Sequence, residues 1–337
     1  MKKIKVVQIG IGHDHATAIL DCMLMQTEIF EIAALAVPES EKADFSDRIE
    51  KYKKRLPLMT VEEALDTEAL DAVIVETEEV NLTKYALLAA KRGLPVHMDK
   101  PGGLDADDFE KLIGLAKSNN TVLHFGYMYR YNDSIMEAVR KARSGELGEV
   151  YSVEAHMDCW HTPEKRQWLS RFPGGMMFFL GCHLIDLILQ IMGEPQKIIP
   201  MNQSTGIDGV TGEDYGFVLF CYKNGISFAK TCAAELGGFS RRQLVICGSK
   251  GTIELRPLEK YESDGTLSTN VCYTDNENGT DWLYSAPFLK SAPADRYNKM
   301  MASFAKMVRG EIKNPFGYDY ELKLYNILLK SCGINRR

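Results

Sequence analysis

Two glycines and two histidines follow the first apolar run of the chain. Residues 6–16 read VVQIGIGHDHA, in which Gly10 and Gly12 have the G-x-G spacing of a loop that binds a dinucleotide pyrophosphate. That chemistry needs a tight turn at the first glycine, close backbone approach at the second, and amides at a helix N-terminus. The third glycine of the usual fingerprint would stand at position 15, where this chain has His15.

The end of the second predicted strand bears on which dinucleotide would bind. Val37 stands where an acidic residue normally holds a ribose 2′-hydroxyl. Glu39 comes two residues later and could substitute, whereas Ser40 and Lys42 could contact a 2′-phosphate, so both NAD and NADP are expected as possible cofactors. The cofactor-binding residues that we predict are Gly10, Ile11, Gly12, His13, Asp14, His15, Val37, Glu39, Thr77, Asp99 and Lys100.

The elements that position this loop follow an alternating pattern. Short apolar runs typical of strands buried on both faces of a parallel sheet alternate with helical patterns, and they lie at 4–9, 30–37, 71–76, 95–98 and 121–125. This alternation predicts βαβ units in a doubly wound sheet. TVEEAL, from Thr60 to Leu65, has the pattern of a capping box at a helix start.

The rest of the chain has a different pattern. A long strand is expected in 149–160, and Asn224-Gly225 and Ser249-Lys250-Gly251 predict two hairpins. The predicted fold is therefore α/β: a Rossmann domain over 1–125, and over 126–337 an α+β domain with an open, mostly antiparallel sheet for substrate binding and oligomerisation. The last helices of the chain are expected to pack back on the first domain.

Three further stretches, in this order along the chain, resemble segments of the Gfo/Idh/MocA oxidoreductase family. They are PVHMDKPGG (95–103), SGELGEVYSVEAH (144–156) and GGMMFFLGCHLIDLILQIMG (174–193). The resemblance covers nearly the whole chain. It implies hydride transfer between NAD or NADP and a hydroxyl carbon of a sugar, a cyclitol or a related polyhydroxylated molecule. It also implies a homodimer or homotetramer packed through the C-terminal sheet.

The resemblance also assigns catalytic residues. Lys100 matches the family lysine beside nicotinamide and the substrate hydroxyl, His183 matches the general acid/base, and Asp186 matches a later aspartate of the same motif. A Lys ammonium stabilises a developing alkoxide, and a His with a pKa near neutrality suits the proton step. The chain departs from the family pattern at His15, at Val37, at Asp99 in place of Glu, and at Phe179 in place of a catalytic Asp.

The loss of the aspartate at 179 raises the question of what charge supports His183. Our hypothesis is that Asp186, Asp158 or a substrate carboxylate supplies it, or that the reaction differs from the usual one. Two alternatives therefore stay open: a redox-neutral lyase or glycosidase with tightly bound NAD, and a non-catalytic regulator that binds a nucleotide or sugar.

Aromatic and basic side chains are expected to contact the substrate by stacking on a sugar face or binding its polar groups. They are Tyr127, Arg130, Trp160, His161, Arg166 and Trp168. A metal site is a rival interpretation of His156, Asp158, Cys159, His161 and His183. Those residues lack a recognised ligand spacing, so no metal is expected.

Composition limits the remaining classes. The net charge of −6 and a pI near 5.7 argue against nucleic-acid binding. No apolar run approaches the ~18 residues of a membrane span, and the N-terminus lacks a signal-peptide pattern. Eight Cys without a C-x-x-C pair are typical of reduced core thiols, so a cytoplasmic protein with a small-molecule substrate is expected.

Overall fold

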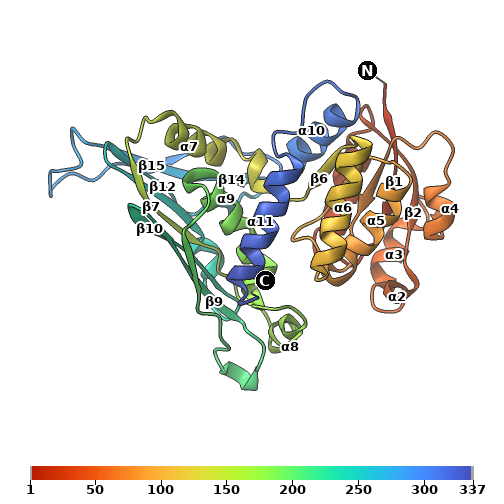
Figure 1. Ribbon diagram of the computed structural model, residues 1–337, viewed down its shortest axis with the longest axis horizontal. Helices are drawn as coiled ribbons and strands as arrows, with labels where there is room; N and C mark the ends of the chain where they lie inside the picture. The colour runs from red at the N-terminus through yellow and green to blue at the C-terminus, as the bar shows by residue number, and fades with distance from the viewer. Residues whose placement is uncertain (1, 335–337) are drawn as a thin grey trace. The chain divides into compact units, whose positions relative to one another are not determined.

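The computed structural model describes residues 2–334 and divides into two compact units (Figure 1). Unit 1 comprises the chain up to Met128 together with Tyr297–Lys323. Unit 2 comprises Tyr129–Arg296 and the chain from Leu324 on. The boundary therefore passes through the last helix, α11 (Tyr318–Ser331).

Unit 1 is built on a six-stranded sheet whose paired strands are all parallel, in the order β3-β2-β1-β4-β5-β6. This is the strand order of a dinucleotide-binding Rossmann fold, as predicted. Most residues of the inner strands β1 and β4 are apolar and buried, because helices cover both faces of such a sheet. The strands are β1 (Ile4–Ile9), β2 (Phe30–Ala36), β3 (Leu58–Met59), β4 (Ala72–Val75), β5 (Val96–Met98) and β6 (Leu123–Phe125).

Two helices of unit 1, α4 and α6, begin at residues whose side chains cap them. Thr60 and Glu63 form the expected capping box, with the Glu63 amide donating to Thr60 Oγ1 at 3.2 Å. At the start of α6, the Asp105 side chain accepts a hydrogen bond from the Asp108 amide at 2.9 Å. The helices are α1 (Ala16–Met25), α2 (Glu39–Lys42), α3 (Ser46–Tyr52), α4 (Val61–Leu65), η1 (Glu79–Asn81), α5 (Leu82–Lys91), α6 (Ala106–Asn119) and α10 (Asn298–Val308).

Unit 2 contains an eight-stranded sheet in the order β16-β15-β12-β11-β7-β10-β9-β8. Its pairs are antiparallel except for β7 with β10, so the sheet is mostly antiparallel, as expected. Both predicted hairpins are present, β9–β10 and β11–β12. The strands are β7 (Val150–His156), β8 (Lys197–Pro200), β9 (Tyr215–Tyr222), β10 (Gly225–Cys232), β11 (Gln243–Gly248), β12 (Gly251–Leu255), β15 (Asn270–Asp275) and β16 (Leu289–Lys290), with a separate pair β13 (Lys260–Tyr261) and β14 (Leu267–Ser268).

One helix of unit 2 presents the predicted histidine. α9 (Cys182–Met192) packs on β7 and β10, is almost wholly buried, and lies with α7 (Asp133–Ser144) on one face of the sheet (Figure 1). A π-helical turn, η4 (Met177–Gly181), leads directly into α9, and such turns are frequent at functional sites. The shorter helices are η2 (Met128–Tyr131), α8 (Pro163–Trp168), η3 (Leu169–Arg171), η5 (Ile207–Gly209) and η6 (Gly238–Arg241).

The sequence led us to expect no membrane-spanning segment and reduced cysteines, and the structure bears on both expectations. Within residues 2–334, every helix is too short or too polar to cross a bilayer. All eight cysteines lie in this described part of the chain, and each is a free thiol there.

Candidate functional site

The glycine loop between β1 and α1 has the backbone that the motif predicts. Gly10 has φ of +90°, and a Cβ there would lie 2.6 Å from the Thr77 backbone. A Cβ on Gly12 would lie 2.8 Å from the Glu41 carboxylate. Only glycine therefore fits either position without displacing a neighbour.

A buried carboxylate holds the amides of this loop. Glu41 Oε2 accepts hydrogen bonds from the amides of Ile11 and Gly12 at 2.8 and 2.9 Å, and Oε1 accepts from the Glu78 amide at 2.8 Å. The carbonyl groups of the same loop bind a cation instead, because Arg48 donates hydrogen bonds to the carbonyls of Ile11, Gly12 and His13. The loop thus presents its amides to an anion, here a carboxylate supplied by α2.

A dinucleotide pyrophosphate fits the same donors. Phosphate oxygens and carboxylate oxygens are both acceptors for convergent backbone amides at a helix N-terminus. Glu41 would have to release the amides of Ile11 and Gly12 before a phosphate could use them. Burial is the largest influence on Glu41 and raises the pKa of its carboxyl group.

The other residues that we predicted to bind the cofactor differ from one another in solvent exposure. Val37 is buried just beyond β2, while Glu39 is exposed and ion-paired with Lys42 at 2.6 Å. Thr77 is buried against Gly10. Asp14 is exposed at the rim of the loop. Glu39 is the nearest exposed carboxylate after β2, so its role with a ribose stays a prediction.

The two loop histidines converge on the end of β5. His13 Nδ1 lies 3.2 Å and His15 Nδ1 3.0 Å from Asp99 Oδ2. His13 and Asp99 are fully buried, and His15 retains slight exposure. Burial lowers the pKa of His13 to about 3. Although burial opposes it, the nearby His15, which also forms a hydrogen bond to the carboxylate, and the Lys100 ammonium hold the pKa of Asp99 well below its usual range.

Lys100 follows Asp99 directly and is fully buried in unit 1. Its carbonyl lies 3.2 Å from His13 Nε2, and its amide donates to Asp99 Oδ1 at 2.6 Å. The predicted lysine and the glycine loop are therefore neighbours at the carboxyl ends of β1 and β5. In open parallel sheets, that edge is where ligands bind. Tyr127, just beyond β6, is buried in the same unit.

Sequence reasoning missed several polar residues at this edge. Glu76 follows β4, and His97 and His124 lie in β5 and β6, with their Nδ1 atoms 2.7 Å apart. His97 Nε2 lies 3.5 Å from Glu76 Oε1. Burial lowers the pKa of His97 to about 4. These residues could have been found from the sequence, because each is a polar residue in or just after a short apolar strand of the parallel sheet.

In unit 2, His183 occupies the first turn of α9 and is 1% exposed. The Tyr129 ring meets its imidazole edge-on, with centroids 5.1 Å apart. Phe179, which we predicted to stand in place of a catalytic aspartate, is buried in η4 and packs against Phe172 and Trp168. The surroundings of Phe179 are therefore apolar.

Asp186 has a partner other than the one that we hypothesised. Both of its oxygens accept hydrogen bonds from Arg130, at 2.8 and 2.9 Å, and Gln190 Nε2 adds a third at 2.9 Å. Arg130 was predicted to contact substrate, yet only 5% of it is exposed. Lys230 Nζ binds Asp158, the other carboxylate that we considered, at 3.0 Å.

The predicted substrate residues of 156–171 differ in accessibility. Trp160 is 54% exposed, whereas Arg166 is buried and ion-paired with Asp208 and Asp214. The ammonium group of Lys165 lies over the Trp168 ring, with Nζ 3.6 Å from the ring centroid. The His161 amide donates to the Ala233 carbonyl at 2.8 Å. Trp160 is therefore the member of this set that is most open to a ligand.

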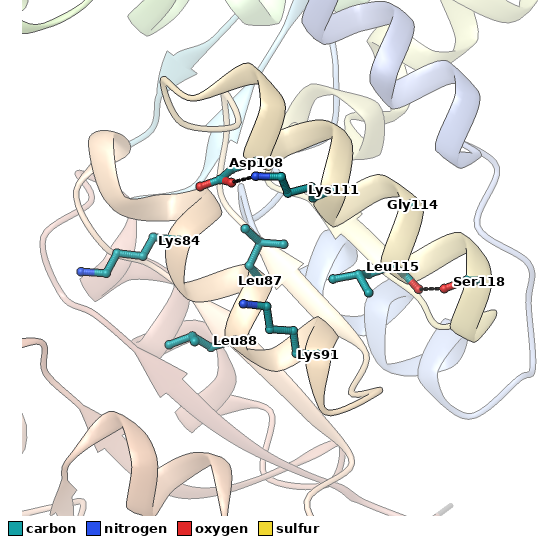
Figure 2. A pocket seen from close by; sticks show the side chains of 9 residues that line it. All are labelled: Lys84, Leu87, Leu88, Lys91, Asp108, Lys111, Gly114, Leu115 and Ser118. Atoms are coloured by element: carbon teal, nitrogen blue, oxygen red, sulfur yellow. Dashed lines mark hydrogen bonds and ion pairs between the residues drawn. The ribbon is translucent and has the colours of Figure 1, made fainter.

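A separate groove lies between α5 and α6 of unit 1, and Figure 2 shows its lining. Lys111 donates there to Asp108 at 2.8 Å, and the rest of the lining is three leucines, two lysines, Gly114 and Ser118. The groove shares no lining residue with the glycine loop or the end of β5. Its residues are Lys84, Leu87, Leu88, Lys91, Asp108, Lys111, Gly114, Leu115 and Ser118.

Comparison with known proteins identifies the family. Residues 4–127 match the oxidoreductase family model with an NAD-binding Rossmann fold, and residues 135–254 match the GFO/IDH/MocA C-terminal domain. The chain is 23% identical to a myo-inositol 2-dehydrogenase of Thermotoga maritima, covering 82% of this chain and 83% of that one. It is 24% identical to a D-apiose dehydrogenase of Paraburkholderia graminis, covering 80% and 73%.

A solved structure shares the fold over nearly the whole chain. It is a candidate NADPH-dependent oxidoreductase of Desulfitobacterium hafniense, with a TM-score of 0.79, 16% identity, and coverage of 99% of this chain and 95% of that one. The sequence motifs, the six-stranded parallel sheet and the two matched regions agree. The chain therefore belongs to the Gfo/Idh/MocA family of oxidoreductases, with an N-terminal NAD-binding Rossmann domain.

Proposed function

We propose that the protein is an NAD(P)-dependent dehydrogenase that transfers a hydride to or from a hydroxyl carbon of a sugar, a cyclitol or a related polyhydroxylated molecule. The observation that carries this proposal is the placement of Lys100 beside the glycine loop, with its carbonyl 3.2 Å from His13 Nε2. Two relatives named as dehydrogenases of a cyclitol and of a sugar support this substrate class.

The cofactor would be held by the loop that now binds a carboxylate. The amides of Ile11 and Gly12 would donate to the pyrophosphate after Glu41 leaves them. Gly10 and Gly12 leave room for the close approach. Bound nicotinamide supplies the hydride acceptor or donor.

The chain's own residues would divide the remaining chemistry. The Lys100 ammonium would stabilise the alkoxide that develops on the substrate oxygen. His183 would accept the hydroxyl proton during oxidation and return it during reduction. Asp186 would act as a positioning residue through Arg130, because both of its oxygens are already bound by that guanidinium.

Substitution of the two proposed catalytic residues tests the mechanism. Cyclitols and aldoses would be screened with NAD⁺ and NADP⁺ by the absorbance of the reduced cofactor. For a substrate found in this way, Lys100→Ala and His183→Ala should each lower kcat by about 10²–10⁴-fold, the usual share of one acid/base or charge-stabilising group. Unchanged kcat in both variants would remove these residues from the mechanism.

A non-catalytic binding protein is the second candidate, and specific observations favour it. The ring of Phe179, which we predicted to stand in place of a catalytic carboxylate, stacks on Phe172, and Glu41 occupies the loop amides. This alternative expects a sugar or nucleotide to bind without turnover across the same panel. A redox-neutral enzyme would instead convert its substrate without net change in cofactor absorbance.

A further inference from the structure

Three potential metal ligands of unit 1 meet at the carboxyl edge of the parallel sheet. They are one ring nitrogen each of His13 and His15 and one carboxylate oxygen of Asp99, and these atoms all lie within 4.8 Å of one another. Two come from the loop after β1, and the third comes from the end of β5. Among residues 2–334, this is the one group of His, Cys, Asp or Glu side chains with such convergence.

The hydrogen bonds of His13 define its tautomer. Its Nε2 lies 3.2 Å from the Lys100 carbonyl, which can only accept, so Nε2 carries the proton. Its Nδ1 accepts the His15 amide at 3.1 Å, so Nδ1 presents a lone pair. Both contacts require the same neutral imidazole.

This tautomer places two electron-rich atoms in contact. His13 Nδ1 and Asp99 Oδ2 are 3.2 Å apart in a fully buried position, and neither carries a hydrogen when Asp99 is ionised. Such a contact is unfavourable unless a positive centre lies near both atoms. The lone pair that accepts the His15 amide in this state is the donor that a metal ion would use.

Two of the three separations between ligand atoms suit a small transition-metal ion, and the third, between His13 and His15, is at most 4.8 Å. Bonds of about 2.0–2.1 Å in tetrahedral geometry separate ligand atoms by roughly 3.4 Å. The observed separations from Asp99 Oδ2 are 3.2 Å to His13 and 3.0 Å to His15. Two imidazoles and one carboxylate favour Zn²⁺ and its neighbours over Ca²⁺ or Mg²⁺, which prefer oxygen ligands throughout.

The surroundings of His13 supply a second, independent indication. Metal-bound histidines donate their other ring N–H to a carbonyl or carboxylate, as His13 does to Lys100. Glu76 is fully buried and its Oε1 lies 3.5 Å from His97 Nε2, but within residues 2–334 neither of its oxygens has a hydrogen bond of normal geometry. Its Oε2 lies 3.9 Å from His13 Nδ1, within reach of a fourth coordination position.

We propose that His13, His15 and Asp99, with Glu76 as an additional oxygen donor, bind one divalent transition-metal ion of the Zn²⁺ type. The partly exposed side chain of His15 provides the route of entry. The ion links the glycine loop to the end of β5, one residue from Lys100. It uses the side chains of His13, His15 and Asp99, which we also predicted to line the cofactor site, whereas the pyrophosphate would use the amides of Ile11 and Gly12. Metal binding is therefore measured in the absence of cofactor, so that its failure and a failure of the proposed function can be told apart.

Metal titration of the full-length protein tests the proposal. After chelator treatment and dialysis, Zn²⁺ binding would be measured by competition with a chromophoric chelator, Co²⁺ binding by visible absorption, and stoichiometry by elemental analysis. One equivalent per chain is expected, with a Co²⁺ spectrum of four- or five-coordinate intensity. Absence of binding at micromolar metal would overturn the proposal.

Variants locate the ion. His15→Ala and Asp99→Asn should each weaken Zn²⁺ binding at least about tenfold, because each removes a direct ligand. His156→Ala, in β7 of unit 2, is the matched control and should bind one equivalent as tightly as the unsubstituted protein. Equal affinity in His15→Ala, or loss of binding in the His156 control, would contradict the assignment.

Folding of each variant must be verified separately. His15 makes no side-chain cap bond to α1 and is partly exposed, so its truncation should preserve the far-ultraviolet circular dichroism spectrum. Asp99→Asn keeps the shape of the side chain. If Asp99→Asn unfolds, His15→Ala still decides the outcome, because it removes a proposed ligand and is expected to stay folded. Each measurement is made without substrate or cofactor, so it does not depend on the proposed function.

Discussion

Removing the Glu41 carboxylate should increase the affinity of the protein for NAD or NADP. In the structure, Glu41 accepts from the amides of Ile11, Gly12 and Glu78 and is fully buried. Bonds to a charged group contribute about 1.5–3 kcal/mol each, and burial of the carboxylate offsets much of this sum. We take about 2 kcal/mol as the net preference for the Glu41-bound loop.

That preference sets the size of the expected effect. A bias of about 2 kcal/mol leaves roughly one molecule in thirty with its loop amides open, and the apparent Kd rises by the same factor. Glu41→Ala should therefore bind the cofactor about 30-fold more tightly. The unliganded variant should also be about 3–5 kcal/mol less stable, because three buried amides lose their acceptor.

Calorimetric titration with NAD⁺, NADP⁺ and inorganic pyrophosphate measures the affinity change, and urea unfolding measures stability. Glu50→Ala, which removes an exposed carboxylate on α3, is the matched control and should leave both unchanged. Glu41→Gln keeps the side-chain volume if the alanine variant fails to fold. Equal or weaker cofactor binding by folded Glu41 variants would refute the idea that this carboxylate competes with the pyrophosphate.

Three further predictions concern stability and pH. Arg130→Met should destabilise the protein by about 3–5 kcal/mol in urea unfolding, because it strands the buried Asp186 carboxylate, whereas Arg140→Ala on the exposed face of α7 should have a far smaller effect. Gly10→Ala should cost about 1–3 kcal/mol from its positive φ alone and should weaken pyrophosphate binding; unchanged stability would contradict the reported turn. The pKa of Glu41 is raised in the folded protein, so its stabilising contribution is present below the unfolded value, near 4.3, and is lost as pH rises through the folded value. Glu41→Gln should therefore gain stability relative to the unsubstituted protein as pH rises from about 4 to 7, and a pH-independent difference would contradict the direction of that shift.

Much of the fold could be predicted from local patterns. Buried apolar runs separated by helical segments determine a parallel sheet, and β1 and β4 follow those runs closely. β3 was missed because it has only two residues, Leu58 and Met59, and its pairing depends on β2. The parallel pairing of β7 with β10 depends on contacts distant in sequence, which no local pattern encodes.

The site was predicted less completely, for physical reasons. The glycines were found because their backbone requirement is local. Glu41 was missed because its partners lie 29 and 30 residues away, and an acidic residue in a short charged helix usually faces solvent. Phe179 was found as a departure from the family pattern, but the engagement of Asp186 by Arg130 becomes visible only in three dimensions.

A crystal structure of the protein with bound NAD⁺ or NADP⁺ tests the central claim most directly. The proposed function predicts pyrophosphate oxygens on the amides of Ile11 and Gly12, Glu41 withdrawn from them, and the nicotinamide ring against Lys100. A complex in which Glu41 still holds both amides and the nicotinamide lies away from Lys100 would contradict the claim.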